Sequence, residues 1–332
     1  MKVQNCARRS GAQQTVRKDT PPGKPRLRQG IPMRLGTQLG LFNPVEGSGK
    51  QKDTILMMEQ CVEAGFRVLD IGFCDAIRPA KPDDLSPDDW ERRIDVIGEA
   101  AAKLGVDFSQ AHLPYADMFN DKKPTTEEEF ALFREMTRRG IIACGRLGVK
   151  WAVAHPFTDL IHGEYDNAVN LDTNLTFYSP FAELAEQNGT GLALEVMSEF
   201  NIERVKRRYC ATADELIELT DRFASPAVGI CWDFGHAHSI HRDHCAALRK
   251  VGHRLKATHV QDCRGDRDAH LIPFIGGNIK WEQIMPTLVE IGYTGDFVLE
   301  SHRFTQNIPE ALRPAAGKFA YAMGEYCLSL AK

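Results

Sequence analysis

Four residues of metal-binding type follow short apolar runs in the second half of the sequence. They are Glu195 after Leu-Ala-Leu, Asp233 after Ile-Cys-Trp, His259 after Ala-Thr and Glu300 after Phe-Val-Leu. One imidazole and three carboxylates form a mixed nitrogen and oxygen ligand set, which suits Mn²⁺, Mg²⁺, Co²⁺ or Zn²⁺ and lacks the thiolates of a structural zinc site. Each residue taken alone is as well explained by helix capping or by pairing with Lys or Arg. Together they predict one bound divalent metal ion.

The spacing of these four residues indicates which elements must position them. Successive members are 38, 26 and 41 residues apart, each about the length of one strand–helix repeat. In a parallel barrel all strands open at their carboxyl ends onto one face, and neighbouring strands lie about 4.8 Å apart. Four side chains at the ends of successive strands can therefore converge on one point.

Eight short apolar runs alternate with longer amphipathic segments, a pattern typical of strand–helix units around a parallel sheet. The runs are 33–40, 66–73, 106–113, 149–157, 191–197, 227–233, 254–261 and 296–300. We expect an α/β fold, a single (β/α)8 TIM barrel that spans residues 33–332. An open doubly wound sheet is the alternative, but the sequence has no Gly-x-Gly-x-x-Gly after the first run and no P-loop.

Helical segments are expected between these runs. Those at 53–64, 87–104, 126–147, 179–188 and 281–291 each end next to a glycine, and Thr212 followed by Glu215 predicts a capping box at the start of another. This helix, glycine, strand order is what the connections of such a barrel require.

Charge is distributed unevenly along the chain. Residues 1–32 carry eight Lys or Arg and one acidic residue, a formal charge of +7, whereas the remainder has 33 basic and 44 acidic residues, a charge of −11. The tail has no apolar periodicity, so we expect it to be disordered. It is open whether it is a solvated extension or misassigned start before Met33, an Arg-rich transit peptide, or a basic arm that binds polyanions. The acidic body predicts no nucleic-acid partner.

The sequence also bears on the compartment. No apolar stretch reaches the roughly 18–20 residues of a membrane span, so no membrane partner is expected. The nine cysteines are scattered and never form Cys-x-x-Cys. Such a distribution is typical of buried thiols in a reducing compartment, and we expect a cytoplasmic protein.

The segments around the four residues resemble the xylose isomerase-like TIM barrels, the sugar phosphate isomerase/epimerase superfamily. They are Trp232-Asp233-Phe234-Gly235-His236, Thr258-His259-Val260-Gln261-Asp262, Asp268-Ala269-His270, Pro273 with Gly276-Gly277-Asn278-Ile279-Lys280-Trp281, and Gly295-Asp296-Phe297-Val298-Leu299-Glu300. The resemblance runs from about Met33 to the C-terminus. The usual Pro-Gly-Glu-Gly turn of the family reads Pro273-Phe274-Ile275-Gly276-Gly277 here, which leaves the substrate open.

The resemblance implies roles for the four strand-end residues. In the ketose 3-epimerase branch the matching Glu, Asp, His and Glu bind one metal, and the two glutamates shuttle protons. Carried over, Glu195, Asp233, His259 and Glu300 are metal ligands, with Glu195 and Glu300 also catalytic. A metal that chelates a sugar carbonyl and the adjacent hydroxyl stabilises the enediolate formed by proton abstraction. Epimerisation or isomerisation follows from which atom receives the proton back.

Further residues match pocket positions of the superfamily. His112 and His155 close the third and fourth predicted strands, and His236, Asp268 and His270 lie on the loops that follow later ones. All five are predicted to bind substrate; in the AP endonuclease branch the equivalents of His112, His155, Asp268 and His270 bind additional zinc. Each histidine is also explained by a hydrogen bond at the barrel rim.

Two basic residues lie on the loop before Asp268. Arg267, like Arg264, is a candidate anchor for a substrate phosphate or carboxylate, with a solvated loop as the alternative. The histidines after His236 are His238, His241 and His244. We do not expect a second metal site there, because the last two are expected on an exposed loop or the next helix.

The sequence therefore predicts a divalent-metal-dependent isomerase or epimerase that acts on a sugar, sugar phosphate or polyol. The alternatives are an inosose dehydratase-like lyase, an AP endonuclease-like metal phosphodiesterase and a non-catalytic sugar-binding barrel. The charge of −11 on the body argues against the endonuclease. A homo-oligomer is expected from analogy alone.

Overall fold

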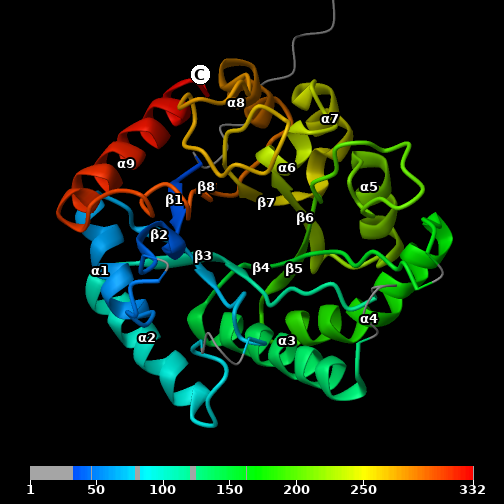
Figure 1. The fold of residues 1–332 in the computed structure, drawn as a ribbon, viewed down its shortest axis with the longest axis horizontal. Helices are drawn as coiled ribbons and strands as arrows, with labels where there is room; N and C mark the ends of the chain where they lie inside the picture. The colour runs from blue at the N-terminus through cyan, green and yellow to red at the C-terminus, as the bar shows by residue number, and fades with distance from the viewer. Residues whose placement is uncertain (1–32, 46, 79–82, 120–124, 162, 332) are drawn as a thin grey trace, which may run out of the picture.

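The computed structural model describes residues 33–45, 47–78, 83–119, 125–161 and 163–331. Within these ranges, eight parallel strands form a barrel with helices around its outside (Figure 1). The strands are β1 (Leu35–Gln38), β2 (Val68–Gly72), β3 (Asp107–His112), β4 (Trp151–Ala154), β5 (Gly191–Glu195), β6 (Val228–Asp233), β7 (Leu255–His259) and β8 (Phe297–Leu299). The predicted α/β barrel is confirmed. The disorder predicted for residues 1–32 concerns a segment outside the described residues.

Strand pairing follows chain order from β1 to β7, and β8 pairs with β1. The two outer strands of this sheet are joined by a parallel bridge between Val260 and Leu299, where the Val260 amide donates to the Val298 carbonyl over 2.8 Å. At the other end, Arg34 donates to both carboxylate oxygens of Asp296, over 2.8 and 2.7 Å. Because Arg34 precedes β1 and Asp296 precedes β8, this ion pair reinforces the junction between the first and last strands.

The helices cover the outside of the barrel (Figure 1). The α-helices are α1 (Thr54–Ala64), α2 (Trp90–Leu104), α3 (Glu127–Leu147), α4 (Asn167–Gln187), α5 (Ala213–Arg222), α6 (Phe234–His238), α7 (His244–Val251), α8 (Trp281–Glu290) and α9 (Arg313–Ser329). Three 3₁₀ segments are η1 (Leu39–Phe42), η2 (Gly252–Arg254) and η3 (Glu310–Leu312).

Helix ends are set by the residues that the sequence indicates. Thr212 and Glu215 form the predicted capping box, each side chain accepting the other residue's backbone N–H. Thr126 and Glu129 form a second one at the start of α3. At the other end of α3, Gly148 has a φ of 69°, a left-handed conformation that costs glycine little and lets the chain turn into β4.

One helix differs clearly from its prediction. A helix was expected at 179–188, but α4 begins at Asn167, where the Asp166 carboxylate accepts from the Ala168 and Val169 amides. In the first turns of α4 polar residues interrupt the apolar pattern, and two of them, Asn170 and Asn174, are fully buried. Asn174 donates to the Phe157 carbonyl over 2.9 Å and accepts from its amide over 2.7 Å, so the helix packs on the loop after β4 through amide groups. Helix α9 was not predicted.

The main apolar core lies between the strands and the surrounding helices, and it includes Trp232, Trp281 and Phe297, all fully buried. A smaller apolar cluster consists of Val153, Ala193, Cys231 and Ala257. The described cysteines are all free thiols, most of them buried, as expected. Within the part of the chain that is described, no helix is long and apolar enough to cross a membrane.

Candidate metal centre

Strand register brings the four strand-end residues to one level. Asp233 at the end of β6 is the direct neighbour of His259 at the end of β7, and Glu195 at the end of β5 is the neighbour of Cys231 on β6. Glu300 follows β8, and its amide donates to the Val260 carbonyl. One ligand atom from each of the four residues lies within 4.8 Å of every other. The predicted convergence is therefore present, and metal binding by these residues stays a prediction.

The imidazole of His259 lies between two carboxylates. Its Nδ1 atom is 3.1 Å from Oε1 of Glu195, and its Nε2 atom is 3.2 Å from Oδ2 of Asp70 on β2. A neutral imidazole carries one N–H and can donate to only one of these oxygens. If Nε2 donates to Asp70, the lone pair of Nδ1 faces Glu195. A cation held by Nδ1 and Glu195 would remove this clash of lone pairs, and carboxylate–histidine–metal arrangements of this kind are general.

Two carboxylate oxygens of the centre are buried without a partner. Oε2 of Glu195 and Oε2 of Glu300 accept no hydrogen bond from the described residues. Glu195 is 0% exposed and Glu300 6%. Burying three carboxylates around one imidazole is costly unless a positive charge compensates them. The donor set therefore fits a hard or borderline divalent cation.

The two glutamates have different electrostatic surroundings. Burial, reinforced by the charges of Asp233 and Glu195, raises the pKa of Glu300 to about 8. Burial also acts to raise the pKa of Glu195, but the neighbouring His259 and His155 outweigh it and hold that pKa well below its usual range. Without a cation, one glutamate favours its protonated form and the other its charged form.

Gln261 orients the carboxylates on one side of the centre. Its Nε2 atom donates to Oδ2 of Asp233 over 3.0 Å and to Oδ1 of Asp268 over 2.9 Å, and its Oε1 accepts the His270 amide over 2.7 Å. Gly235 leaves the space this requires, because a Cβ built there would lie 2.4 Å from Cδ of Gln261. A glycine is therefore needed at this position of the Trp-Asp-Phe-Gly-His segment so that Gln261 can pack against it.

His112 and His155 converge on the unpaired oxygen of Glu195. Nε2 of His155 lies 3.1 Å and Nε2 of His112 3.5 Å from Oε2 of Glu195, and the two Nε2 atoms are 3.1 Å apart. Nδ1 of His112 must donate to the Leu113 carbonyl, 2.8 Å away, so its Nε2 is free to bind a cation or a proton. Both histidines are thus part of the centre.

His236 and His270 converge in the same way on Asp268. Their Nδ1 atoms donate to the carbonyls of Val196 and Glu300, both over 3.1 Å. Their Nε2 atoms then face Oδ2 of Asp268, at 3.6 Å from His236 and 3.0 Å from His270. Burial acts to raise the pKa of Asp268, but hydrogen bonds from the two histidines outweigh it and lower that pKa strongly.

The remaining predicted residues lie outside the centre. Arg267 is exposed and, among the described residues, forms no hydrogen bond or ion pair, whereas Arg264 donates to the Gly276 carbonyl. His244 begins α7, the next helix, as expected; it is buried and hydrogen-bonds His238 over 3.0 Å. His238 also contacts Asn278, so this pair ties α6 and α7 to the loop before α8.

Several residues of the centre had no predicted role. Asp70 follows two apolar residues inside β2 rather than ending a strand, and Gln261 stands two residues beyond His259. His302 lies with its ring 4.1 Å from that of His270 and, with Glu300, forms another potential ligand group. Only the fold shows that these side chains point to the centre, although the carboxylate inside the apolar run of β2 was a usable signal.

Comparison with known proteins identifies the family of the chain. Residues 58–320 match the family described as xylose isomerase-like TIM barrel. The uncharacterised protein MJ1311 of Methanocaldococcus jannaschii is 28% identical over 61% of this chain and 66% of its own length. The uncharacterised protein y4fM of Sinorhizobium fredii is 29% identical over 48% of this chain. The chain spans only 49% of the length of the second relative.

Solved structures share the fold. A D-tagatose 3-epimerase-like protein has a TM-score of 0.67 at 22% identity, covering 90% of this chain and 98% of its own. A D-psicose 3-epimerase has a TM-score of 0.67 at 16% identity, with 89% and 99% covered. The 3-keto-D-glucoside 4-epimerase YcjR of E. coli has a TM-score of 0.64 at 17% identity, with 89% and 100% covered. At these identities the likeness concerns the barrel.

Proposed function

This chain belongs to the xylose isomerase-like TIM-barrel family, and on that premise we propose that it is a divalent-metal-dependent sugar isomerase or epimerase. The observation that carries the proposal is the buried convergence of Glu195, Asp233, His259 and Glu300, with Nδ1 of His259 facing a carboxylate oxygen. Several structural neighbours are sugar epimerases by name, which supports the same class of reaction.

The four residues would hold the cation, and Asp70 would orient His259 from beneath. A bound divalent cation supplies a Lewis acid that polarises a sugar carbonyl and the hydroxyl next to it. The carboxylates of Glu195 and Glu300 come from β5 and from the end of β8, so they reach the substrate from different strands. One would remove the proton next to the carbonyl, and the other would return one.

Proton exchange with solvent tests this proposal. Ketoses, ketose phosphates and keto-polyols are incubated with the protein and Mn²⁺ or Mg²⁺ in D₂O, and deuterium at the carbon next to the carbonyl is measured by NMR. We expect metal-dependent incorporation that chelator abolishes. Glu195→Gln should reduce it by about 10²–10⁴-fold, the usual contribution of a general base. The surface variant Asp221→Asn is the control and should exchange normally.

The products separate the proposal from two alternatives. A lyase of the inosose dehydratase kind also abstracts this proton, but its product has lost water. A sugar-binding barrel without activity would bind a sugar by calorimetry and incorporate no deuterium, and that result would rule out the enzyme.

A metal phosphodiesterase is a second candidate, and a specific observation favours it. Besides the four-residue centre, the Nε2 atoms of His112 and His155 converge on Glu195, and those of His236 and His270 converge on Asp268. These two clusters offer ligands for additional cations. Metal analysis of the purified protein decides: three zinc ions per chain with cleavage of a phosphodiester favour the phosphodiesterase, and one ion favours the isomerase.

A further inference from the structure

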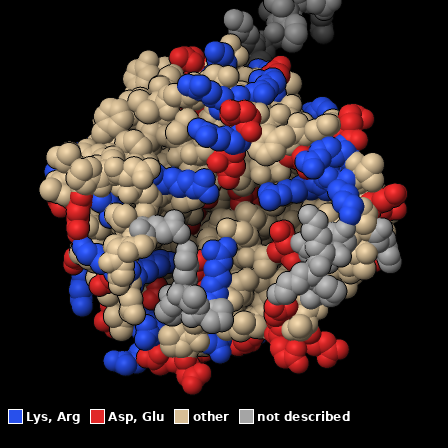
Figure 2. All heavy atoms as spheres, in the orientation of Figure 1, with Lys and Arg blue, Asp and Glu red and all other residues tan. Residues whose placement is uncertain are grey.

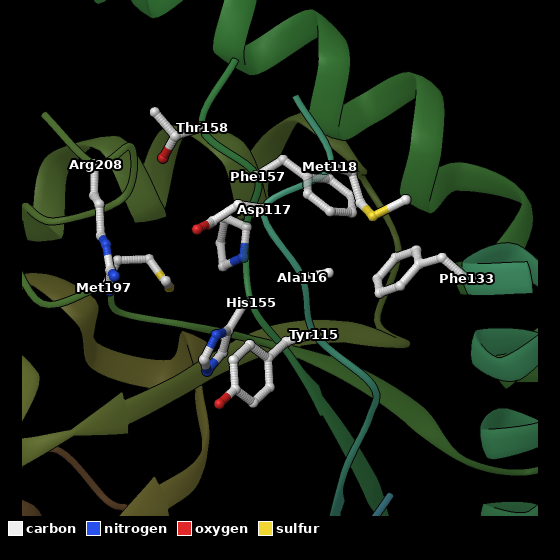
Figure 3. A pocket seen from close by; sticks show the side chains of 11 residues that line it. Tyr115, Ala116, Asp117, Met118, Phe133, His155, Phe157, Thr158, Met197 and Arg208 are labelled. Carbon is white, nitrogen blue, oxygen red and sulfur yellow. The ribbon is translucent and has the colours of Figure 1, made fainter. Parts of the chain in front are cut away.

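A pocket opens directly beside the candidate metal centre. It is a small pocket with a cavity volume of about 30 Å³, and it opens to solvent. His155, whose Nε2 faces Glu195, forms one wall, and Arg208 and Thr158 lie on others (Figure 3). Because His155 belongs to both, a ligand whose reacting end lies at the centre can extend into this pocket.

The backbone around Arg208 is held in place by two side chains, Glu199 and Thr158. Its amide donates to Oε2 of Glu199 over 3.0 Å, and the amide of the next residue, Tyr209, donates to Oγ1 of Thr158 over 3.0 Å. Glu199 also accepts from the Phe200 amide, so it fixes two points of the loop between β5 and α5. The Arg208 side chain therefore starts from an ordered position next to the pocket.

The charge of Arg208 has no counterpart among the residues that the structure describes. Among the described residues its only side-chain hydrogen bond runs from Nη1 to the Ser198 hydroxyl, 3.1 Å away, and no carboxylate pairs with it. The preceding Arg207 is different: it pairs with Glu215 over 2.5 Å and lies 3.6 Å above the Tyr165 ring. The charge of Arg207 is therefore neutralised within the fold. The guanidinium group of Arg208 lies at the pocket, where its remaining N–H groups can bind a ligand.

The lining of the pocket also carries an acceptor. Asp117 lines the pocket from the loop after β3, and within the described chain it forms no hydrogen bond or ion pair, with Arg208 or any other residue. On the face that Figure 2 shows, Lys and Arg side chains lie around the middle with carboxylates between them. A guanidinium fork recognises carboxylate or phosphate, and an unpaired carboxylate accepts from hydroxyls.

We propose that this pocket binds the far end of the substrate and that Arg208 recognises an anionic group there, a carboxylate or a phosphate, while Asp117 accepts from a neighbouring hydroxyl. The substrate class is then a sugar acid or a sugar phosphate rather than a neutral ketose. This inference rests on the proposed function for what happens at the other end of the substrate. The anion site itself does not depend on the reaction.

Binding of simple anions tests the site without any reaction. Inorganic phosphate and malonate are titrated separately into the Mn²⁺-loaded protein by calorimetry, with Arg208→Met as the variant. Arg204→Met is the matched control, because it removes an exposed charge from the same loop. We expect one of the anions to bind, with affinity reduced at least about tenfold in Arg208→Met and unchanged in Arg204→Met. Tighter binding of phosphate identifies a phosphate ester, and tighter binding of malonate identifies a sugar acid.

Two results would overturn the inference: neither anion binds to the wild-type protein, or Arg208→Met binds as the wild type does. Thermal unfolding shows whether the variant is folded, and Arg208→Lys, which keeps the charge but loses the fork, should recover part of the affinity. If deuterium enters no substrate while phosphate binding still requires Arg208, the proposed reaction is wrong and the anion site stands. If a neutral ketose exchanges its proton as fast as the corresponding sugar acid and sugar phosphate, with the same KM, the proposed reaction is supported and the anion site is wrong.

Discussion

Nε2 of His259 lies 3.2 Å from Oδ2 of Asp70, at a depth where both side chains are completely buried. Asp70 also accepts from Nε2 of Gln110 over 2.9 Å, and its other oxygen has no partner among the described residues. A buried carboxylate beneath a histidine holds one ring nitrogen as a donor and turns the other toward the centre. Asp70 is thus a positioning residue for His259.

Asp70→Asn removes the charge of this partner and keeps its shape. We expect the affinity for Mn²⁺ to fall by about 10–100-fold, because the orienting partners of metal-binding histidines have effects of this size. Calorimetric titration of metal-free protein measures the change. Asp221→Asn, which removes a surface carboxylate paired with Arg254, should bind Mn²⁺ normally. Unchanged affinity in Asp70→Asn would mean that His259 needs no such partner.

Gly235→Ala tests whether Gln261 positions the carboxylates. The new Cβ would meet Cδ of Gln261 at 2.4 Å and push the amide away from Asp233 and Asp268. Overpacking of this kind costs about 1–3 kcal/mol, which urea unfolding measures, and weaker Mn²⁺ binding should accompany it. Gly98→Ala is the control, since its Cβ meets only a side-chain methyl at 3.4 Å in the middle of α2. That change should stabilise the protein by about 0.5–1 kcal/mol.

Asp262 holds the loop that carries Asp268 and His270. Its carboxylate is 1% exposed and accepts from the amides of Cys263, Phe274 and Ile279 and from Nε1 of Trp281. Asp262→Ala leaves these buried donors without an acceptor, and we expect a loss of about 3 kcal/mol or more in unfolding free energy. Urea unfolding followed by tryptophan fluorescence measures it. Asp266→Ala, an exposed change on the same loop, is the control and should lower the unfolding free energy little. An equally large loss in this control would show that the loop is sensitive to any substitution and that the effect is not specific to Asp262.

The stability should depend on pH through Asp83. Burial raises the pKa of this carboxyl to about 6, against about 3.9 for an unfolded chain. Because the folded form binds the proton more tightly, Asp83 favours folding below pH 4, and this contribution is lost as the pH rises to 6. Asp83→Asn removes the effect, so the variant should gain about 2–3 kcal/mol relative to the wild type between pH 4 and pH 7. If the unfolding free energies of the variant and the wild type differ by the same amount at every pH, Asp83 is not the cause of the pH dependence.

The barrel and the four-residue centre follow from local sequence patterns. Each strand lies within one of the eight segments predicted from the sequence, and helices start and stop at caps such as Thr212 and Gly148, which act over a few residues. Glu195, Asp233, His259 and Glu300 are predictable because parallel strands all end on one face, so a polar residue at a strand end is bound to lie there. No long-range information was needed for this step.

Tertiary structure alone decided the rest, because it depends on contacts between distant parts of the chain. Asp70 and His259 are separated by 189 residues, and their pairing requires a closed barrel that brings β2 opposite β7. Asn174 appears as a surface residue in the sequence, yet it is buried because the loop after β4 supplies its partners. Arg207 and Arg208 are indistinguishable as letters. The hydrogen bonds that fix the loop between β5 and α5 decide their different surroundings. Arg207 pairs with Glu215, whereas Arg208 lines the pocket and pairs with no carboxylate of the described residues.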